Sequence, residues 1–203
     1  MSKTQTGVLG ARESGGRVRP QRADARRNMQ ALIAAARQAF AEKGGDASLD
    51  DIARRAGVGP GTLYRHFPTR EALIEAVYRD GIDAIAESGN RLAATESPGD
   101  ALADWLLEYT AYVAEKRGLA KSLVVTLDNR DEVFAYAHAR VRGTAEALFE
   151  RAKEASAIRP DVEITDVIHL ANAIALGSES TPDGREQARR LLALALEGLR
   201  RRD

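Results

Sequence analysis

The residues with the clearest chemistry lie in a short polar stretch of types that can bind DNA. Thr62 could meet a base edge with its hydroxyl or a thymine methyl with its own methyl group, and Gly61 would let the backbone approach a duplex closely. Arg65 could hold a guanine with two hydrogen bonds, the alternative being an arginine that is only solvated. Ser48 and Thr69 each begin a predicted helix, whose free N–H groups could bind phosphate.

Two short helices must position these residues, and the sequence predicts both. Ser48 is followed three residues later by an aspartate, which fits an acid-ended capping box at the start of the first helix. Gly57 ends that helix, because a residue without Cβ can adopt the left-handed conformation of a tight turn. Pro60 suits the first position of the second helix, in which Leu63 and Phe67 share a buried face. Two such helices form a helix-turn-helix, whose second helix enters the major groove, and a generic pair of core helices is the alternative.

The run from Asp51 to Leu73, DIARRAGVGPGTLYRHFPTREAL, resembles the tetracycline-repressor (TetR) family of bacterial transcription regulators. The resemblance covers residues 25–75 closely and the remainder in length and helical pattern. Two residues differ from the family pattern or lie where it varies. Pro60 stands where a small or polar residue is usual, and Arg65 occupies a variable position. Both bear on which operator sequence is bound.

The resemblance also implies particular contacts with DNA. Tyr64 and His66 occupy positions similar to those that contact phosphate in the family. Arg70 matches its basic residue at the start of the fourth helix. We therefore expect double-stranded DNA as the partner of this segment, with Tyr64 and His66 on its backbone and Arg70 among the DNA-binding residues.

Apolar residues recur at helical spacing along the whole chain, and no alternating pattern longer than a few residues indicates a strand. We expect an all-α protein of about nine helices, with a three-helix head. The predicted divisions are a disordered basic arm over residues 1–22, a helix-turn-helix DNA-binding domain over 23–69, and a helical effector-binding and dimerisation domain over 70–203. The fourth helix, from residue 70, links the two domains. Thr95–Gly99 is predicted to be a loop, and residues 119–128 a short apolar segment.

The net charge of zero hides a basic N-terminal end. Residues 1–30 carry seven basic and two acidic side chains, whereas residues 31–80 carry seven of each sign, so the remainder is acidic on balance. A basic end favours a polyanion as partner, and a solvated tail is the alternative. The chain has no cysteine, no signal-like apolar segment and no run near the ~20 apolar residues of a membrane span, so we expect a cytoplasmic protein without a membrane partner.

Aromatic residues in the C-terminal part could line a pocket for an unidentified small-molecule effector between helices, with ordinary core packing as the alternative. Histidines there could be pocket donors or metal ligands, but they lie on separate helices, so we expect no metal and no cofactor. The predicted pocket residues are Trp105, Tyr109, Tyr112, Phe134, Tyr136, His138 and Phe149.

The last two predicted helices are apolar along one face, which favours pairing across a twofold axis into a four-helix bundle. We therefore expect a homodimer. The predicted interface residues are Ile168, Ala171, Ala188, Leu191, Leu192, Ala195 and Leu199.

The chain carries no phosphate-binding loop, dinucleotide fingerprint, nucleophile elbow or zinc-protease motif, so no catalytic residue is predicted. The expected function is a ligand-responsive transcription regulator, a repressor that binds a palindromic operator as a dimer. One alternative is a helix-turn-helix regulator without an effector. Another is a helical enzyme with an accessory head, for which the sequence offers no catalytic site.

Overall fold

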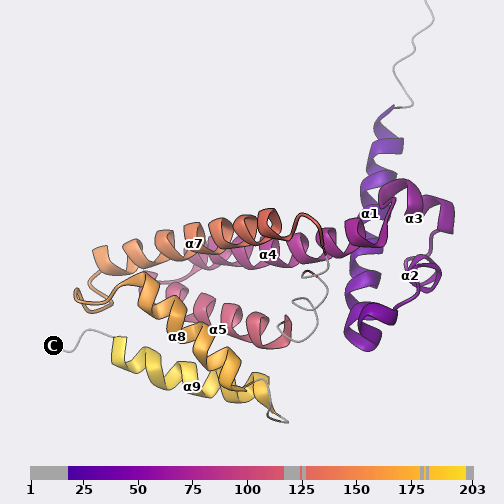
Figure 1. The fold of residues 1–203 in the computed structure, drawn as a ribbon. Helices are drawn as coiled ribbons and strands as arrows, with labels where there is room; N and C mark the ends of the chain where they lie inside the picture. Colours follow the sequence, from indigo (N-terminus) through magenta and orange to yellow (C-terminus); the bar gives the residue numbers. More distant parts are fainter. Residues whose placement is uncertain (1–17, 117–123, 125–126, 179–180, 182, 200–203) are drawn as a thin grey trace, which may run out of the picture.

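The computed structural model describes residues 18–116, 124, 127–178, 181 and 183–199 of the 203-residue chain. This part of the chain is all-α, as predicted, with eight α-helices, one 3-10 turn at Gly44–Asp46 and no strand (Figure 1). The helices are α1 (Val18–Lys43), α2 (Leu49–Arg55), α3 (Pro60–His66), α4 (Arg70–Thr95), α5 (Pro98–Lys116), α7 (Arg130–Glu154), α8 (Ile164–Ser178) and α9 (Gly184–Leu199).

The first three helices form a small head around their own core. Leu32 and Phe40 of α1, Ile52 of α2 and Leu63 of α3 are all buried there, because each lies on the apolar stripe of its helix. The head sits at one end of the molecule, and α1 stands across the direction in which the body helices run (Figure 1).

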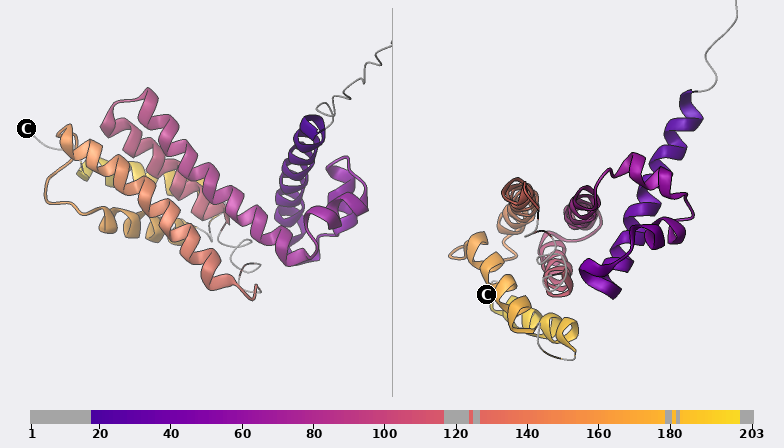
Figure 2. Two further views of the ribbon diagram at one scale, coloured as in Figure 1. Left: turned by 90° about the horizontal axis from the view of Figure 1, so that it is seen from above. Right: turned by 45° about the vertical axis from the view of Figure 1, so that its right-hand side comes forward.

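α4 leads from the head into the body and forms its central support. It packs against α5 and α7, while α8 and α9 pack on α5 from the other side (Figure 2). Trp105 of α5 is fully buried at the centre of this bundle, and its indole Nε1–H donates to the Ile85 carbonyl of α4 at 3.0 Å. The body therefore has a core separate from that of the head.

The body also contributes to the core of the head. Val124, Leu127 and Val133 are buried in the same cluster as the apolar residues of α1–α3. The Asn129 side-chain amide, just before α7, donates to the Glu75 carboxylate of α4 at 2.9 Å. The start of α7 is thus tied to the segment of α4 that enters the head.

Two predicted segments, the basic arm and the loop before α5, have other bounds in the structure. α1 begins at Val18, so residues 18–22 belong to a helix and not to a disordered arm. A proline in the first turn is compatible with this start, because the N–H groups there have no partner within the helix. The expected loop at Thr95–Gly99 shrinks to Glu96 and Ser97, since α5 begins at Pro98. Most of the apolar segment 119–128 lies outside the described residues.

Candidate DNA interface and ligand pocket

The sequence places α3 so that one side packs on the head and the other faces outward. Pro60 occupies the first helical position, as predicted, and Gly59 precedes it in an extended conformation. Leu63 is fully buried and Phe67 nearly so, which anchors the helix to the core. Gly61 lies on the exposed side, where an added Cβ would meet no atom within 4 Å. The backbone of this first turn is therefore open to a partner.

The polar residues of α3 differ in exposure. Tyr64 is 48% exposed and Arg65 is exposed as well, as the helical spacing predicts. Thr62 and His66 are half-buried, so they lie at the edges of the outer face and not on its centre. The Nε2 atom of His66 is buried and has no hydrogen-bond partner in the described part of the chain.

Both predicted N-caps are present next to this helix. The Ser48 hydroxyl accepts from the Asp51 N–H at 3.5 Å, and the Thr69 hydroxyl accepts from the Ala72 N–H at 3.1 Å. The turn between α2 and α3 contains Gly57 with φ of +69°, the left-handed conformation expected of it. The two caps thereby fix where α2 and α4 begin, and both cap residues remain exposed.

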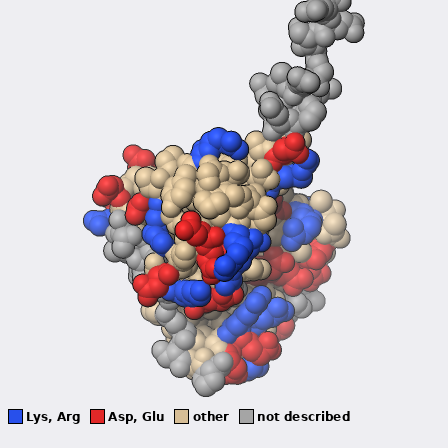
Figure 3. Space-filling view, turned by 90° about the vertical axis from the view of Figure 1, so that its right-hand side faces the viewer, with Lys and Arg blue, Asp and Glu red and all other residues tan. Residues whose placement is uncertain are grey.

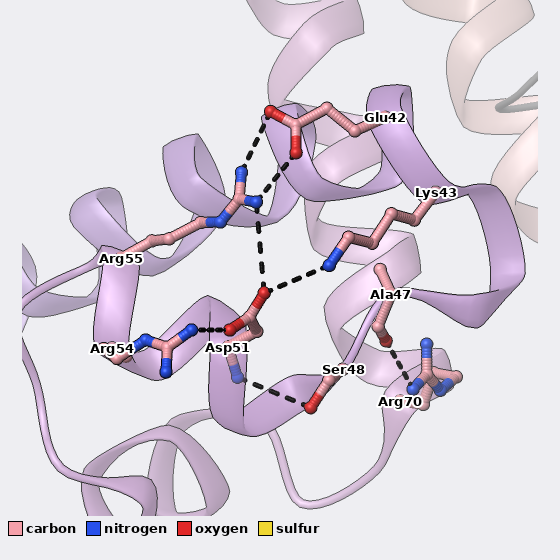
Figure 4. A network of polar contacts seen from close by, with 8 residues as sticks. All are labelled: Glu42, Lys43, Ala47, Ser48, Asp51, Arg54, Arg55 and Arg70. Atoms are coloured by element: carbon pink, nitrogen blue, oxygen red, sulfur yellow. Dashed lines mark hydrogen bonds and ion pairs between the residues drawn. The ribbon is translucent and has the colours of Figure 1, made fainter.

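A network of ion pairs joins α1 to α2 (Figure 4). The Arg55 guanidinium donates to both oxygens of Glu42 at 3.0 and 2.7 Å, and its hydrogen bond lowers the pKa of that carboxyl group. Asp51 pairs with Lys43 at 3.3 Å and with Arg54, and the hydrogen bond from Lys43 lowers the pKa of Asp51. Asp51, the aspartate of the predicted capping box, is therefore part of this ion-pair network.

Arg70 makes hydrogen bonds within the head. Its guanidinium donates to the Gly45 carbonyl at 3.1 Å and to the Ala47 carbonyl at 2.7 Å, the second of which is drawn in Figure 4. These carbonyls belong to the short connection between α1 and α2. Arg70 thus holds the α1–α2 connection against the start of α4, and its expected contact with DNA stays a prediction.

The outer side of the head carries both signs of charge. Acidic and basic side chains lie next to one another across it, and a largely uncharged area lies above them (Figure 3). The ion pairs of α2 account for part of this mixture, because Arg54 and Arg55 are each matched by a carboxylate. The predicted basic arm lies outside the described residues over 1–17.

The body contains a cavity of about 430 Å³ between α4, α5, α7 and α8. Four of the seven predicted pocket residues line it: Tyr109, Tyr112, Phe134 and His138. Tyr109 is held in place by stacking on Trp105, with ring centroids 5.4 Å apart, and by a hydrogen bond from its hydroxyl to Asn172 Oδ1 at 3.2 Å. Four predicted residues thus line a cavity whose wall is partly aromatic, and its occupation by a ligand stays a prediction.

The other three predicted pocket residues do not line this cavity. Trp105 and Phe149 are buried in the body core, because their positions on α5 and α7 point between the helices. Tyr136 faces α4, where its hydroxyl donates to Asp83 at 2.5 Å and Arg79 lies 4.4 Å above its ring. The hydrogen bond to Asp83 raises the pKa of Tyr136.

Several lining residues were not predicted. Tyr78 of α4 borders the cavity, and burial raises the pKa of its phenol. Arg142, Thr165, His169 and Asn172 line the sides formed by α7 and α8. The sequence contained the i,i+4 spacing of His138 and Arg142, and of Thr165 and His169, but gave no indication that these two rows face each other.

The structure corrects three of the seven residues expected at a dimer interface. Ala171, Ala188 and Leu192 are buried inside the protomer, and Ala171 and Leu192 belong to the body core. Ile168 lines the cavity, and Leu191 is 40% exposed. Ala195 and Leu199 are half-buried. The apolar side chains that α8 and α9 leave exposed are instead Leu170, Leu176, Leu191 and Leu194.

Among the described residues, no cluster of three or more His, Asp or Glu side chains has an arrangement that could hold a metal ion. The described helices also include none with the length and apolar character of a membrane span.

A helix-turn-helix head with an exposed second helix, joined to an all-α body, defines a DNA-binding transcription regulator. Residues 32–77 match the model of bacterial regulatory proteins of the tetR family, and residues 97–201 match the SbtR-like transcriptional regulator C-terminal domain. The second match spans more than half of the chain. The chain belongs to the TetR family, and the family predicted from the helix-turn-helix is confirmed.

Solved structures resemble most of the chain. A TetR transcriptional regulator from Streptomyces coelicolor is 40% identical, with a TM-score of 0.75, over 86% of this chain and 99% of that one. A TetR transcription regulatory protein from Mycobacterium vanbaalenii is 34% identical, with a TM-score of 0.74, over 90% and 100%. A curated relative, an HTH-type transcriptional repressor of Mycobacterium tuberculosis, is 39% identical over 71 residues, which are 34% of this chain and 36% of the relative. The chain therefore matches only about a third of the length of such curated relatives.

Proposed function

We propose that the protein is a ligand-responsive repressor that binds a palindromic operator as a homodimer. The observation that carries this proposal is the outward face of α3, with an open backbone at Gly61 and an exposed Tyr64 beside it. A relative that is 39% identical over 71 residues is described as a repressor, which supports repression over activation. No step of this function requires catalysis or a cofactor, and it places the protein in the cytoplasm with the chromosome.

The proposed contacts divide between bases and backbone. Thr62 and Arg65 read base edges in the major groove, and Pro60 and Gly61 bring the start of α3 close to the duplex. Phosphate contacts come from two sources, which are side chains of α3 and the helix starts next to it. The residues proposed for phosphate are Ser48, Tyr64, His66, Thr69 and, secondarily to its hydrogen bonds within the head, Arg70.

The proposed dimer uses the exposed apolar side chains of α8 and α9. Leu191 and Leu194 lie on one side of α9, and Leu170 and Leu176 protrude from α8. Water-exposed leucines that recur on two adjacent helices are typical of an interface. We propose residues 23–69, with the helical extension from residue 18, as the DNA-binding unit and residues 70–203 as the effector-binding and dimerising unit.

The response to a ligand is proposed to start at the cavity wall nearest the head. Tyr78 and Phe134 line the cavity and meet in an edge-to-face contact with ring centroids 6.3 Å apart. Both also pack against the apolar cluster of the head. A ligand that displaces either ring would therefore shift the population of head positions, and with it the spacing of the two recognition helices.

Selection of binding sites from a pool of random DNA duplexes tests this function. The wild-type protein is expected to enrich a palindrome whose half-sites lie about one helical turn or a multiple apart. The Thr62→Ala variant is expected to enrich a more relaxed sequence, because one base-reading side chain is lost. Enrichment of single half-sites, or of no sequence at all, would contradict the proposal. Release of the selected duplex by the small-molecule fraction of a bacterial extract tests the response to a ligand.

A further inference from the structure

The cavity has two chemically different regions. Its inner wall is aromatic, formed by Tyr78, Tyr109, Tyr112 and Phe134 from α4, α5 and α7. Its outer rim is formed by two facing helices, with His138 and Arg142 on α7 and His169 on α8. The three rim side chains are exposed, whereas Tyr109 is buried. A bound molecule would thus have one end among rings and the other at the surface.

The one permanently charged residue among the described residues that line the cavity is Arg142. None of the described lining residues is acidic, while Arg142 carries a permanent positive charge and the two imidazoles can donate hydrogen bonds. Glu146 accepts from Arg142 Nε at 2.6 Å and offsets part of this charge. That bond uses one of the five N–H donors of the guanidinium, so donors remain for a second anion.

The inner wall is suited to an aromatic body. Gly81 permits the position of the Tyr112 ring, because a Cβ at this site would lie 2.8 Å from the Tyr112 hydroxyl oxygen. Tyr109 is fixed by its stacking on Trp105 and its bond to Asn172. Rings held in this way present faces and edges to a second aromatic group at little further entropic cost.

We propose that the effector is a small aromatic anion, bound with its rings against the tyrosines and phenylalanine of the inner wall and its carboxylate or similar group at Arg142, His138 and His169. This inference rests on the proposed ligand response and adds the chemical class of the ligand. A cation is disfavoured because it would meet Arg142 at the rim without an acidic partner in the lining.

A matched set of probes tests the class by calorimetric titration of the full-length protein. The set is 4-biphenylacetate, its neutral amide, the cationic 2-(4-biphenyl)ethylamine, and decanoate as a carboxylate without rings. The acetate is expected to bind at least about tenfold more tightly than the amide, since a charge-assisted hydrogen bond is stronger than a neutral one. The amine and decanoate are expected to bind more weakly than the acetate. Equal or tighter binding of the amide or the amine would overturn the proposed negative charge of the effector. Equal binding of decanoate would overturn its proposed aromatic rings.

A pair of variants locates the anion. Arg142→Gln is expected to lower the affinity for the acetate to that for the amide while leaving the affinity for the amide unchanged. Arg151→Gln removes the same charge from an exposed position of α7 outside the cavity and is expected to change neither. An unaltered acetate affinity in Arg142→Gln would overturn the proposed rim site.

Failure of this inference can be told apart from failure of the proposed function. Selection of a palindromic operator needs no ligand, so it reports on the function independently. If a palindrome is selected but no acid of the set binds, only the ligand class is wrong. If no palindrome is selected, the function itself fails whichever probe binds.

Discussion

On α3, neighbouring residues serve two different surfaces. Leu63 is fully buried in the head, while Tyr64, the next residue, is 48% exposed. The helical period of 3.6 residues produces this division, and the cap, the turn glycine and the leading proline set where the period begins. A substitution on the outer face is therefore expected to change DNA binding without changing the fold. Gly61 is the position where these two effects are most easily separated.

Gly61→Ala is expected to preserve or raise the melting temperature and to weaken operator binding. Alanine stabilises a helical position by roughly 0.5–1 kcal/mol relative to glycine, and the new Cβ meets no protein atom. The same methyl group would stand between the backbone and a duplex that approaches closely. Thermal unfolding and fluorescence anisotropy with the selected operator measure the two effects. Undiminished affinity would show that the backbone at Gly61 does not approach DNA.

Gly143→Ala provides the control for this variant. Gly143 is exposed in α7, and a Cβ there also meets no atom within 4 Å. We expect the same gain in helix stability and no change in operator affinity. A fall in affinity for both variants would point to an indirect effect of helix stability.

Arg70→Gln is expected to lower the free energy of unfolding by about 1–3 kcal/mol, since it removes hydrogen bonds from a charged donor to Gly45 and Ala47. Denaturant unfolding measures this change. The slope of log affinity against log salt is expected to become shallower by about 0.9, because one proposed phosphate contact is lost. An unchanged slope would show that Arg70 serves the head alone.

Between helices, a few small residues determine how closely the elements approach. A Cβ on Gly89 of α4 would lie 2.3 Å from the Thr144 Cγ2 of α7 and 3.1 Å from the Trp105 ring of α5. Glycine at this position therefore lets the three central helices pack closely. The cavity lies along the same helices, so its shape depends on this packing.

Gly89→Ala is expected to destabilise the protein by about 1–3 kcal/mol, as overpacking of a filled core does. The fall in melting temperature should be partly reversed by Thr144→Ala, which removes the nearest methyl group. A double-mutant cycle measures this coupling. Additive effects of the two substitutions would mean that α4 and α7 separate instead of clashing at this point.

The same elements show which features the sequence could predict. The caps at Ser48 and Thr69, the left-handed Gly57 and the two faces of α3 follow from local rules, and all are present. The pocket prediction was right for Tyr109 and wrong for Trp105, although both lie on the apolar stripe of α5. Periodicity assigns a residue to a face, whereas lining a cavity depends on where the facing helices diverge, and a single sequence does not contain that information.

At the scale of the whole molecule, part of the body completes the core of the head. Val124, Leu127 and Val133 belong to the body by sequence but are buried with the apolar residues of α1–α3. The sequence could not reveal this, because the contacts join segments far apart in the chain. A rearrangement of side chains around the cavity would therefore be transmitted to the head through packed residues, whereas a flexible linker would not transmit it.

In the proposed dimer each head engages one half-site, so tight operator binding depends on pairing of the two bodies. Leu192, which the sequence favoured as an interface residue, is 1% exposed within the protomer, whereas Leu194 is 72% exposed. Which of the two leucines is exposed depends on how α9 is rotated about its axis against α5 and α8. The amphipathic pattern indicates only that one face of this helix is apolar. The test of dimerisation therefore belongs at Leu194.

Leu194→Asp is expected to leave the protomer folded and to separate the dimer, because it places a carboxylate without a partner in an apolar interface. Sedimentation velocity should show a monomer, and affinity for the palindromic operator should fall although α3 is unchanged. Ala147→Asp, which adds the same charge at an exposed position of α7, should remain dimeric and bind normally. A folded dimer of Leu194→Asp would place the interface on another surface. Loss of the helical circular dichroism signal would instead show that the exposed leucine contributes to folding of the single chain. A dimer built on α8 and α9 requires an unchanged spectrum together with monomeric sedimentation.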